Sequence, residues 1–287
     1  MPAVTVVVPT CGRPELLARC LAALEQQSLP REDYDIIVVD DSRLRSGPAA
    51  ARNRGWRQAR AAIVAFTDDD TEPHVQWLEN GLEAMRSADA ASGRIVMPIP
   101  GTPTDYERDA QGLERSEFVT ANCFVRRELL ERLDGFDEGF RMAWREDSDL
   151  HFRLLRCGAR IVRAPDAVVV HPLRPAPWGV SLKQQRKVMF DALLFKKHRA
   201  LYRSRIRAYA RWDYYAMVAC LLLAVAGFAP AIVAWALLTA RFFMHRMRGA
   251  SRRPGHVLEM LVTSVLIPPL AVFWRLAGAL RYRVAFL

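Results

Sequence analysis

Short apolar runs alternate with stretches of helical periodicity over residues 4–97, and this alternation limits the possible folds more than any other feature. The apolar runs are rich in β-branched residues, which is typical of buried strands. The predicted strands cover residues 4–9, 35–40, 62–66 and 93–97, and the predicted helices cover residues 14–27, 48–60 and 73–86. A series of this kind predicts an α/β fold with a parallel, doubly wound sheet.

The pattern becomes less regular after residue 97. Residues 98–116 are rich in Pro, Gly, Thr and acidic side chains, which predicts a long surface loop, and such loops often act as lids over a site. Further strands are expected at residues 118–125, 159–163 and 167–171, and further helices at residues 127–133 and 146–157.

Charge is divided unequally along the chain, whose net charge is +10. Acidic side chains outnumber basic ones in residues 1–173, whereas residues 174–287 hold many Lys and Arg but only three acids. The basic part predicts an anionic partner, either phospholipid or nucleic acid. The five cysteines form no CxxC pair, so neither a zinc site nor a disulfide framework is expected.

Uncharged segments favour phospholipid as that partner. Residues 214–240 carry no charge and exceed the roughly 20 apolar residues that cross a bilayer. Residues 260–274 form a shorter run that Pro268 and Pro269 are expected to break. Nucleic-acid binding needs no such run, so no nucleic-acid partner is expected. A buried core helix is the alternative for each run, and basic flanks on both sides of residues 214–240 leave open a hairpin bent at residues 227–230.

We therefore divide the chain into an α/β domain over residues 1–180, basic amphipathic juxtamembrane helices over residues 181–213 and membrane-embedded helices over residues 214–287. The basic helices would lie on anionic headgroups or, alternatively, pack on the domain as solvated helices. No N-terminal signal peptide is expected, which places the first domain on the cytoplasmic side of a plasma (inner) membrane. The preference for Arg over Lys indicates a GC-rich bacterial genome.

Polar side chains follow three of the predicted strands, at the point where each strand ends. Thr10 and Arg13 follow the first strand, Asp40-Asp41 the second and Asp68-Asp69-Asp70 the third. Parallel strands bring their carboxyl ends to one edge of a sheet, where α/β proteins bind ligands. Adjacent carboxylates repel one another, and a hard cation such as Mg²⁺ or Mn²⁺ relieves that repulsion. A metal site is expected here, with a solvated acidic loop as the alternative.

Six segments together resemble the family 2 glycosyltransferases of the GT-A fold. They are Val6-Val-Val-Pro-Thr10 with Arg13, Ile37-Val-Val-Asp-Asp-Ser42, Ala51-Arg-Asn-Arg-Gly55, Phe66-Thr-Asp-Asp-Asp70, Asp134-Gly-Phe-Asp137 and Arg145-Glu-Asp-Ser-Asp-Leu150. They occur in the family's order. The resemblance implies a GT-A catalytic domain, a nucleotide-sugar donor with a UDP-sugar favoured, a divalent cation (Mn²⁺ or Mg²⁺) and inversion at the anomeric carbon.

The resemblance also implies roles on the donor side. Pro9, Thr10 and Arg13 would line the nucleotide pocket, Asp41 would accept a hydrogen bond from the base, Arg52 would approach the diphosphate, and Asp68, Asp69 and Asp70 would form the DxD-type site with Asp70 as metal ligand. For Arg52 a surface salt bridge is the alternative. Many relatives carry an aromatic residue where this chain has Cys11-Gly12, which leaves the nucleotide base open.

On the acceptor side, Asp147 matches the catalytic base, which must take a proton from the acceptor hydroxyl. Helix capping is the alternative role for Asp147 and Glu146. Asp149 would support or contact the acceptor, and Trp144 would either stack on a sugar ring or lie in the core. His171 follows a predicted strand and would complete the metal site, with a packed histidine as the alternative.

These features favour a membrane-attached, metal-dependent inverting glycosyltransferase. Its acceptor would be a hydroxyl of a lipid-linked or membrane-proximal glycan, as in the synthesis of cell-envelope polysaccharides. A polyprenyl-phosphate sugar synthase is the alternative within the class, and there an attacking phosphate would need no strong base. A haloacid-dehalogenase-like phosphatase would carry Thr at the position of Glu72. A membrane scaffold with a degenerate nucleotide-binding fold is the non-enzymatic alternative.

Overall fold

The computed structural model describes residues 1–286, which form two compact units. The first unit consists of Met1–Pro98 and Gln111–Leu173. The second consists of Ile99–Ala110 and the chain from Arg174 onward. The chain therefore leaves the first unit twice, after β5 (Ala90–Val96) and after β7 (Ile161–Val170).

A seven-stranded mixed sheet forms the centre of the first unit, in the order β2-β1-β3-β6-β5-β7-β4. The remaining strands are β1 (Val4–Thr10), β2 (Tyr34–Asp40), β3 (Ile63–Thr67), β4 (Glu72–Pro73) and β6 (Asn122–Arg126). β1 lies between β2 and β3 and runs parallel to both, with Val4 opposite Tyr34 and Ile63.

The expected parallel sheet is correct only in part, because β6 runs antiparallel to β3 and β5, and β4 runs antiparallel to β7. Parallel neighbours need a crossover connection along one face of the sheet. Between β5 and β6 the chain instead passes through the second unit. It returns to the sheet on the side where β5 ends, so β6 runs antiparallel to β5. The two strands expected at residues 159–163 and 167–171 are one strand, β7, which pairs with β5 through a register shift between Gly93 and Arg94.

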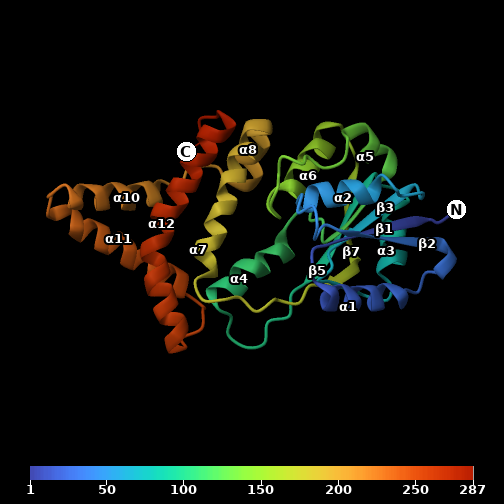
Figure 1. Ribbon diagram of the computed structural model, residues 1–287, viewed down its shortest axis with the longest axis horizontal. Helices are drawn as coiled ribbons and strands as arrows, with labels where there is room; N and C mark the ends of the chain where they lie inside the picture. The colour runs from blue at the N-terminus through green and yellow to red at the C-terminus, as the bar shows by residue number, and fades with distance from the viewer. Residues whose placement is uncertain (287) are drawn as a thin grey trace. The chain divides into compact units, whose positions relative to one another are not determined.

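Two apolar clusters cover the two faces of this sheet. One combines Val6 and Val8 with α1 (Pro14–Glu25) and α3 (Trp77–Met85). The other combines Val7 with α2 (Pro48–Trp56), α5 (Arg127–Leu133) and α6 (Glu146–Arg156). Successive side chains of a strand point to opposite faces, so the continuous apolar run of β1 supplies both cores. Figure 1 shows α1 and α2 on opposite faces.

The second unit is helical. Its helices are α4 (Asp105–Gln111), α7 (Val180–Gln184), α8 (Met189–Lys197), α9 (Arg199–Leu201), α10 (Trp212–Val225), α11 (Pro230–Met247) and α12 (Pro254–Tyr282). The continuous loop expected at residues 98–116 is therefore wrong, since α4 and a 3₁₀ turn over Gly112–Arg115 lie within it. Asp105 Oδ2 accepts a hydrogen bond from Arg246 Nη2 at 2.8 Å, a contact between distant segments that local composition does not indicate.

The uncharged run at residues 214–240 is not one continuous helix but a hairpin of two helices, α10 and α11, bent between residues 225 and 230. Gly227 adopts φ of 93° between α10 and α11, and Pro230 occupies the first turn of α11. A glycine with positive φ favours the end of one helix, and a proline in the first turn favours the start of the next. The basic segment at residues 181–211 is helical. It is a series of short helices, and α8 buries Phe190 and Phe195.

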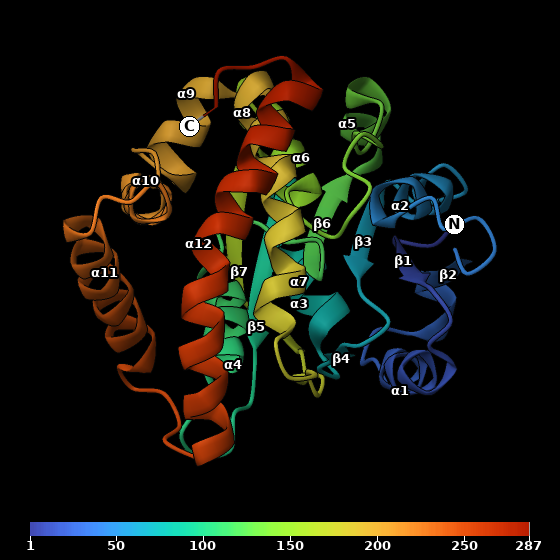
Figure 2. The same cartoon turned by 60° about the vertical axis from the view of Figure 1, so that its left-hand side comes forward.

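α12 continues through Pro268 and Pro269, where we expected a break. Ile267, Ala271 and Val272 pack against α10, and this packing outweighs the hydrogen bonds that the prolines remove. Figure 2 shows α7 and α8 alongside α12. By length and composition, α12 is the helix among the described residues that could cross a bilayer.

Candidate active site

The end of β1 and the segment after β3 meet at the carboxyl edge of the sheet, because these strands are parallel neighbours. Thr10 Oγ1 donates a hydrogen bond to Asp69 Oδ2 at 2.6 Å, and Arg13 Nη2 lies 2.6 Å from Asp69 Oδ1. Asp69 is fully buried, and burial raises its pKa. Pro9 is buried within β1. Asp69 therefore links Thr10 and Arg13 to the acidic segment after β3. Thr10, Arg13 and Asp69 were expected on the donor side, and these polar contacts join them to one another.

Asp68, Asp70 and His171 form a group whose potential ligand atoms all lie within 4.8 Å of one another. His171 directly follows β7, and its backbone N–H donates to Val96 O at 2.8 Å, which fixes it beside the end of β5. His171 Nε2 lies 3.7 Å from Asp70 Oδ1, and its Nδ1 is buried without a hydrogen-bond partner. Two carboxylates and an imidazole with an unused nitrogen fit a divalent cation such as Mn²⁺. The structure thus brings Asp70 and His171 together and adds Asp68.

Arg52, on α2, connects this group to the Glu146-Asp147 motif. Its Nη2 donates to Asp68 Oδ1 at 2.6 Å, and its Nη1 donates to Glu146 Oε1 at 3.2 Å. Only 3% of its side chain is exposed, so the surface salt bridge is wrong. The guanidinium, expected at the diphosphate, is engaged here by two protein carboxylates. A single residue therefore links the acidic segment after β3 to the start of α6.

One guanidinium does not compensate every carboxylate around it. Burial tends to raise the pKa of Asp68, but Arg52 and His171 outweigh burial and hold this pKa below its usual value. Burial, together with the charge of Asp147, raises the pKa of Glu146 to about 7. Burial also raises the pKa of Asp147. A carboxylate with a raised pKa is a better proton acceptor near neutral pH, as a general base requires.

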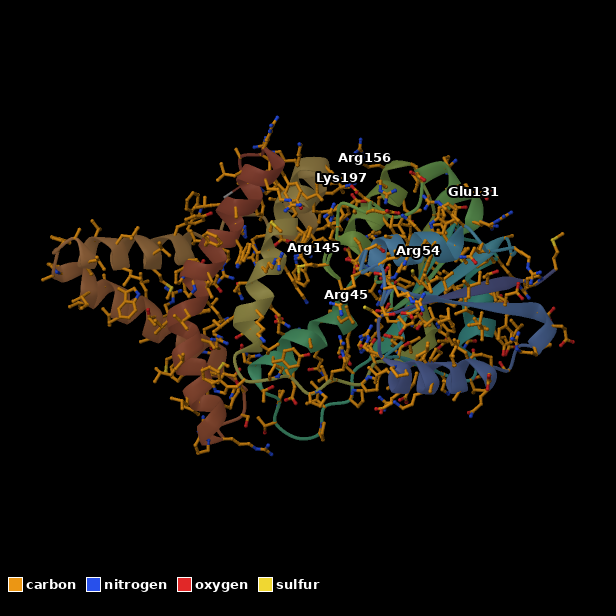
Figure 3. The ribbon with its side chains drawn as sticks, viewed as in Figure 1. Arg45, Arg54, Glu131, Arg145, Arg156 and Lys197 are labelled. Carbon is orange, nitrogen blue, oxygen red and sulfur yellow. The ribbon has the colours of Figure 1, made fainter. Side chains whose placement is uncertain are left out.

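The start of α6 orders the residues around Asp147. Arg145, labelled in Figure 3, adopts φ of 76°, and its guanidinium lies 4.5 Å from the ring centroid of Trp144. Trp144 is half-buried, so it is not a core residue. Asp149 is fully buried, and Arg153 Nε donates to it at 2.8 Å. Of the two roles expected for Asp149, this geometry favours support of α6 over contact with an acceptor.

Asp41 lies directly after β2, and its carboxylate accepts hydrogen bonds from the far end of the loop that leads to α2. It accepts hydrogen bonds from Ser46 Oγ at 2.6 Å, the Gly47 backbone N–H at 2.9 Å and Arg54 Nη2 at 2.6 Å. Burial tends to raise the pKa of Asp41, but these hydrogen bonds hold it below its usual value. The Ser46 backbone N–H hydrogen-bonds the same carboxylate, so donors of the protein already use the roughly four acceptor positions of Asp41, which was expected to contact a nucleotide base.

Sequence reasoning missed Asn53, which joins α2 to the turn at residues 134–137. Asn53 Oδ1 accepts from the Phe136 N–H at 2.8 Å, and Asn53 Nδ2 donates to Phe136 O at 2.8 Å. Trp56 Nε1 also donates to Asn53 Oδ1 at 2.8 Å. Asn53 and Arg54 both lie in the Ala51–Gly55 motif, so the motif indicated the helix but not which way these side chains point.

Two family models match the chain. The model described as glycosyl transferase family group 2 matches residues 63–276, which is more than half of the chain, and the model for glycosyl transferase family 2 matches residues 5–45. The chain is a family 2 glycosyltransferase. The resemblance carried by the six motifs is confirmed, and the phosphatase and scaffold hypotheses are wrong.

Relatives of this glycosyltransferase carry the same enzyme class in their names. It is 28% identical over 225 residues to the glycosyltransferase AglE of Haloferax volcanii, covering 66% of this chain and 72% of AglE. It is 34% identical over 145 residues to the pre-mycofactocin glycosyltransferase of Mycobacterium tuberculosis, covering 45% of this chain and 30% of that protein.

A solved structure shares the GT-A fold of this glycosyltransferase. The mannosyltransferase PcManGT from Pyrobaculum calidifontis, in complex with GDP-Man and Mn²⁺, matches with a TM-score of 0.56 and 20% sequence identity. The match covers 98% of this chain and 87% of PcManGT. At this identity the likeness concerns the fold.

Proposed function

We propose that this glycosyltransferase moves a sugar, with inversion, from a nucleoside-diphosphate sugar to a hydroxyl group of a lipid-linked or membrane-proximal glycan. The carrying observation is the bridge by Arg52, which places the Asp68, Asp70 and His171 group and the Glu146-Asp147 motif in one continuous network. The Asp68, Asp70 and His171 group is suited to binding a metal and the diphosphate, and the Glu146-Asp147 motif is suited to proton abstraction.

The proposed reaction is a single displacement. The acceptor oxygen bonds to the anomeric carbon of the donor, the bond from that carbon to the diphosphate oxygen breaks, and the nucleoside diphosphate leaves with the bonding electrons. Asp147 takes the hydroxyl proton. Asp68, Asp70 and His171 would hold Mn²⁺ or Mg²⁺, which would supply positive charge for the departing diphosphate. Arg52 keeps Asp68 ionised and holds Glu146 beside the base.

A hydroxyl acceptor is favoured over a polyprenyl phosphate. A phosphate oxygen is already ionised at neutral pH and needs no base, whereas burial gives Asp147 the raised pKa that a base uses. The polyprenyl-phosphate sugar synthase is the second candidate, because it would use the same donor site.

The enzyme is proposed to act at the inner membrane of a bacterium, with the first unit in the cytoplasm and phospholipid as a further partner. Support comes from the excess of Lys and Arg after residue 174 and from the length and apolar composition of α12. Positive flanks of apolar segments are retained on the cytoplasmic side.

Release of nucleoside diphosphate from a donor panel tests the proposal. The panel holds UDP-sugars, which are favoured, and GDP-mannose, because PcManGT was solved with GDP-Man and Mn²⁺. The full chain in detergent is assayed with Mn²⁺, Mg²⁺ or a chelator, beside Asp147→Asn and the exposed control Asp166→Asn. Metal-dependent release that Asp147→Asn loses and the control keeps is expected. Absence of release from every donor under every metal would overturn the proposal.

A second assay, which varies the acceptor, distinguishes transfer to a glycan hydroxyl from the polyprenyl-phosphate sugar synthase. Lipid-linked glycans and polyprenyl phosphate are offered with the identified donor, and the labelled product is hydrolysed in mild acid and by glycosidase. Sugar on a glycan hydroxyl supports the proposal. Product on polyprenyl phosphate, formed equally well by Asp147→Asn, would favour the synthase.

A further inference from the structure

The end of the α10–α11 hairpin exposes a group of large apolar side chains. We name it the hairpin tip, and it consists of Leu222, Leu223, Val225, Phe228, Ile232 and Val233. Val225 is 80% exposed and Phe228 is 57% exposed. Water-soluble surfaces rarely expose a contiguous apolar patch of this kind without a partner.

α12 adds a second exposed apolar surface within the same unit. We name it the outer stripe, and it consists of Leu258, Leu261, Leu266, Phe273, Leu276 and Leu280. Their successive spacings are three, five, seven, three and four residues, which places them along one broad side of a helix. The opposite side of α12 is buried, and it includes Met260, Ser264, Ile267, Ala271 and Gly278.

The length of α12 would permit it to cross a bilayer, but the charged helices that pack against it argue against a crossing. The segment of α7 to α8 packs along its inner side, where Gly278 allows Met189 O to approach within 2.7 Å of a Cβ position. That segment carries Lys183, Arg186, Lys187, Asp191, Lys196 and Lys197. Arg186 lies 5.7 Å from the ring centroid of Trp274, in the apolar part of α12. A crossing α12 would carry these charges into hydrocarbon, which is strongly unfavourable.

The hairpin is too short to cross and has basic residues at its base. α10 has 14 residues and α11 has 18. α10 is therefore about 21 Å long, below the roughly 30 Å of a hydrocarbon core, and the uncharged part of α11 ends at Ala240, before Arg241. Arg211 precedes α10, Arg241 lies in α11, and the ring centroids of Tyr214 and Phe242 lie 5.4 Å apart across the two helices. Both basic ends of the hairpin are therefore on the same side, opposite the uncharged tip.

We propose that the second unit binds one leaflet of an anionic phospholipid bilayer, with the hairpin tip inserted in the acyl region and the outer stripe in the interface, and that α10, α11 and α12 do not cross. Basic residues at the hairpin base meet the lipid phosphates, and the apolar surfaces bury in the leaflet. This inference deepens the phospholipid part of the proposed function and does not depend on the donor chemistry.

Vesicle flotation measures the binding directly. The full chain is diluted from detergent into phosphatidylcholine vesicles with or without phosphatidylglycerol, beside Val225→Asp, Phe228→Asp and the control Val75→Asp. Val75 is an exposed valine of the first unit. Each tip substitution is expected to weaken partitioning by about tenfold or more, from the apolar burial lost, whereas the control matches the wild type. Equal partitioning of all variants would overturn the inserted tip.

Cysteine labelling distinguishes one-leaflet binding from crossing. Phe228→Cys, Arg253→Cys and Arg281→Cys are each made with Ser at Cys11, Cys157 and Cys220, which are not buried. In sealed vesicles, an impermeant maleimide added outside is expected to label both ends of α12 and to label the tip only after detergent. Labelling of one end of α12 with protection of the other would show that α12 crosses and would overturn the inference.

A second copy of the chain is the competing occupant of these surfaces. Light scattering in lipid-free buffer detects it, and a defined dimer that does not float with vesicles would overturn the inference. Donor hydrolysis in detergent is measured on every variant. If the wild type releases no nucleotide yet floats as expected, the proposed reaction fails and the membrane inference stands.

Discussion

Arg52 Nη2 lies 2.6 Å from Asp68 Oδ1 in a position that solvent barely reaches. The same guanidinium donates to Glu146, which is 94 positions further along the chain. A buried cation between two carboxylates is stabilising only when all of its partners are present, because removing one leaves an uncompensated charge. Arg52 is thus a positioning residue for both halves of the site.

Replacing Arg52 with Gln is expected to lower the free energy of unfolding by about 3–5 kcal/mol, the usual cost of breaking a buried ion pair. Arg52→Lys should fall in between, because an ammonium group does not bridge two carboxylates as the planar guanidinium does. Chemical denaturation measures both variants. The control is Arg57→Gln, which removes exposed ion pairs from the residue that follows the same helix and should cost under about 1 kcal/mol. Equal losses for Arg52→Gln and the control would contradict the bridge.

Gly135→Ala is expected to destabilise the first unit and loosen the turn that Asn53 holds. Gly135 has φ of 61°, and a Cβ there would lie 2.3 Å from both Asn53 Oδ1 and Trp56 Nε1. Gly158→Ala is the matched control, since Gly158 has φ of 75° and open space around it. Backbone strain should cost about 1 kcal/mol in both variants, and the clash should add a further 1–3 kcal/mol to Gly135→Ala alone. Thermal denaturation decides, and similar melting temperatures would argue against the clash.

The stability of the chain should fall with rising pH because of Glu146. Its folded pKa of about 7 lies above its usual value of 4.5, so ionisation disfavours the folded state. The contribution is complete below about pH 4.5 and is lost as the pH rises through about 7, on the order of 3 kcal/mol. Glu146→Gln should flatten this part of the profile, measured by denaturation with chelator present. Glu131→Gln, an exposed position on α5 (Figure 3), serves as control and should leave the profile unchanged.

Mn²⁺ binding should depend on Asp70 and His171. Asp70→Asn is expected to weaken Mn²⁺ binding by about tenfold or more, since it removes a charged ligand, and His171→Ala is expected to have a smaller effect. Electron paramagnetic resonance of free Mn²⁺ reports the affinity without any turnover. Asp40→Asn is the control, because Asp40 ends the neighbouring β2 but bonds only its own turn through Ser42. Unchanged affinity in Asp70→Asn would rule out this metal site.

Local sequence signals predicted the elements that depend on neighbouring residues. The start of β1 and the starts of α1 and α2 at Pro14 and Pro48 agree with the structure, because β-branched runs and proline act through nearby backbone. Where these predictions failed, tertiary contacts determined the local structure. The 98–116 loop became partly helical beside Arg246, and the run at residues 214–240 became a hairpin at Gly227.

The sequence by itself determined the family, the strand ends that supply Asp68 and Asp70, and the Glu146-Asp147 pair. Tertiary structure decided their partners, including the antiparallel entry of β6, the Arg52 bridge between distant motifs and the buried pairing of Asp149 with Arg153. The physical reason is one of range. Strand and helix patterns arise from residues a few positions apart, whereas an ion pair across 94 positions exists only after the sheet and helices have packed and excluded water.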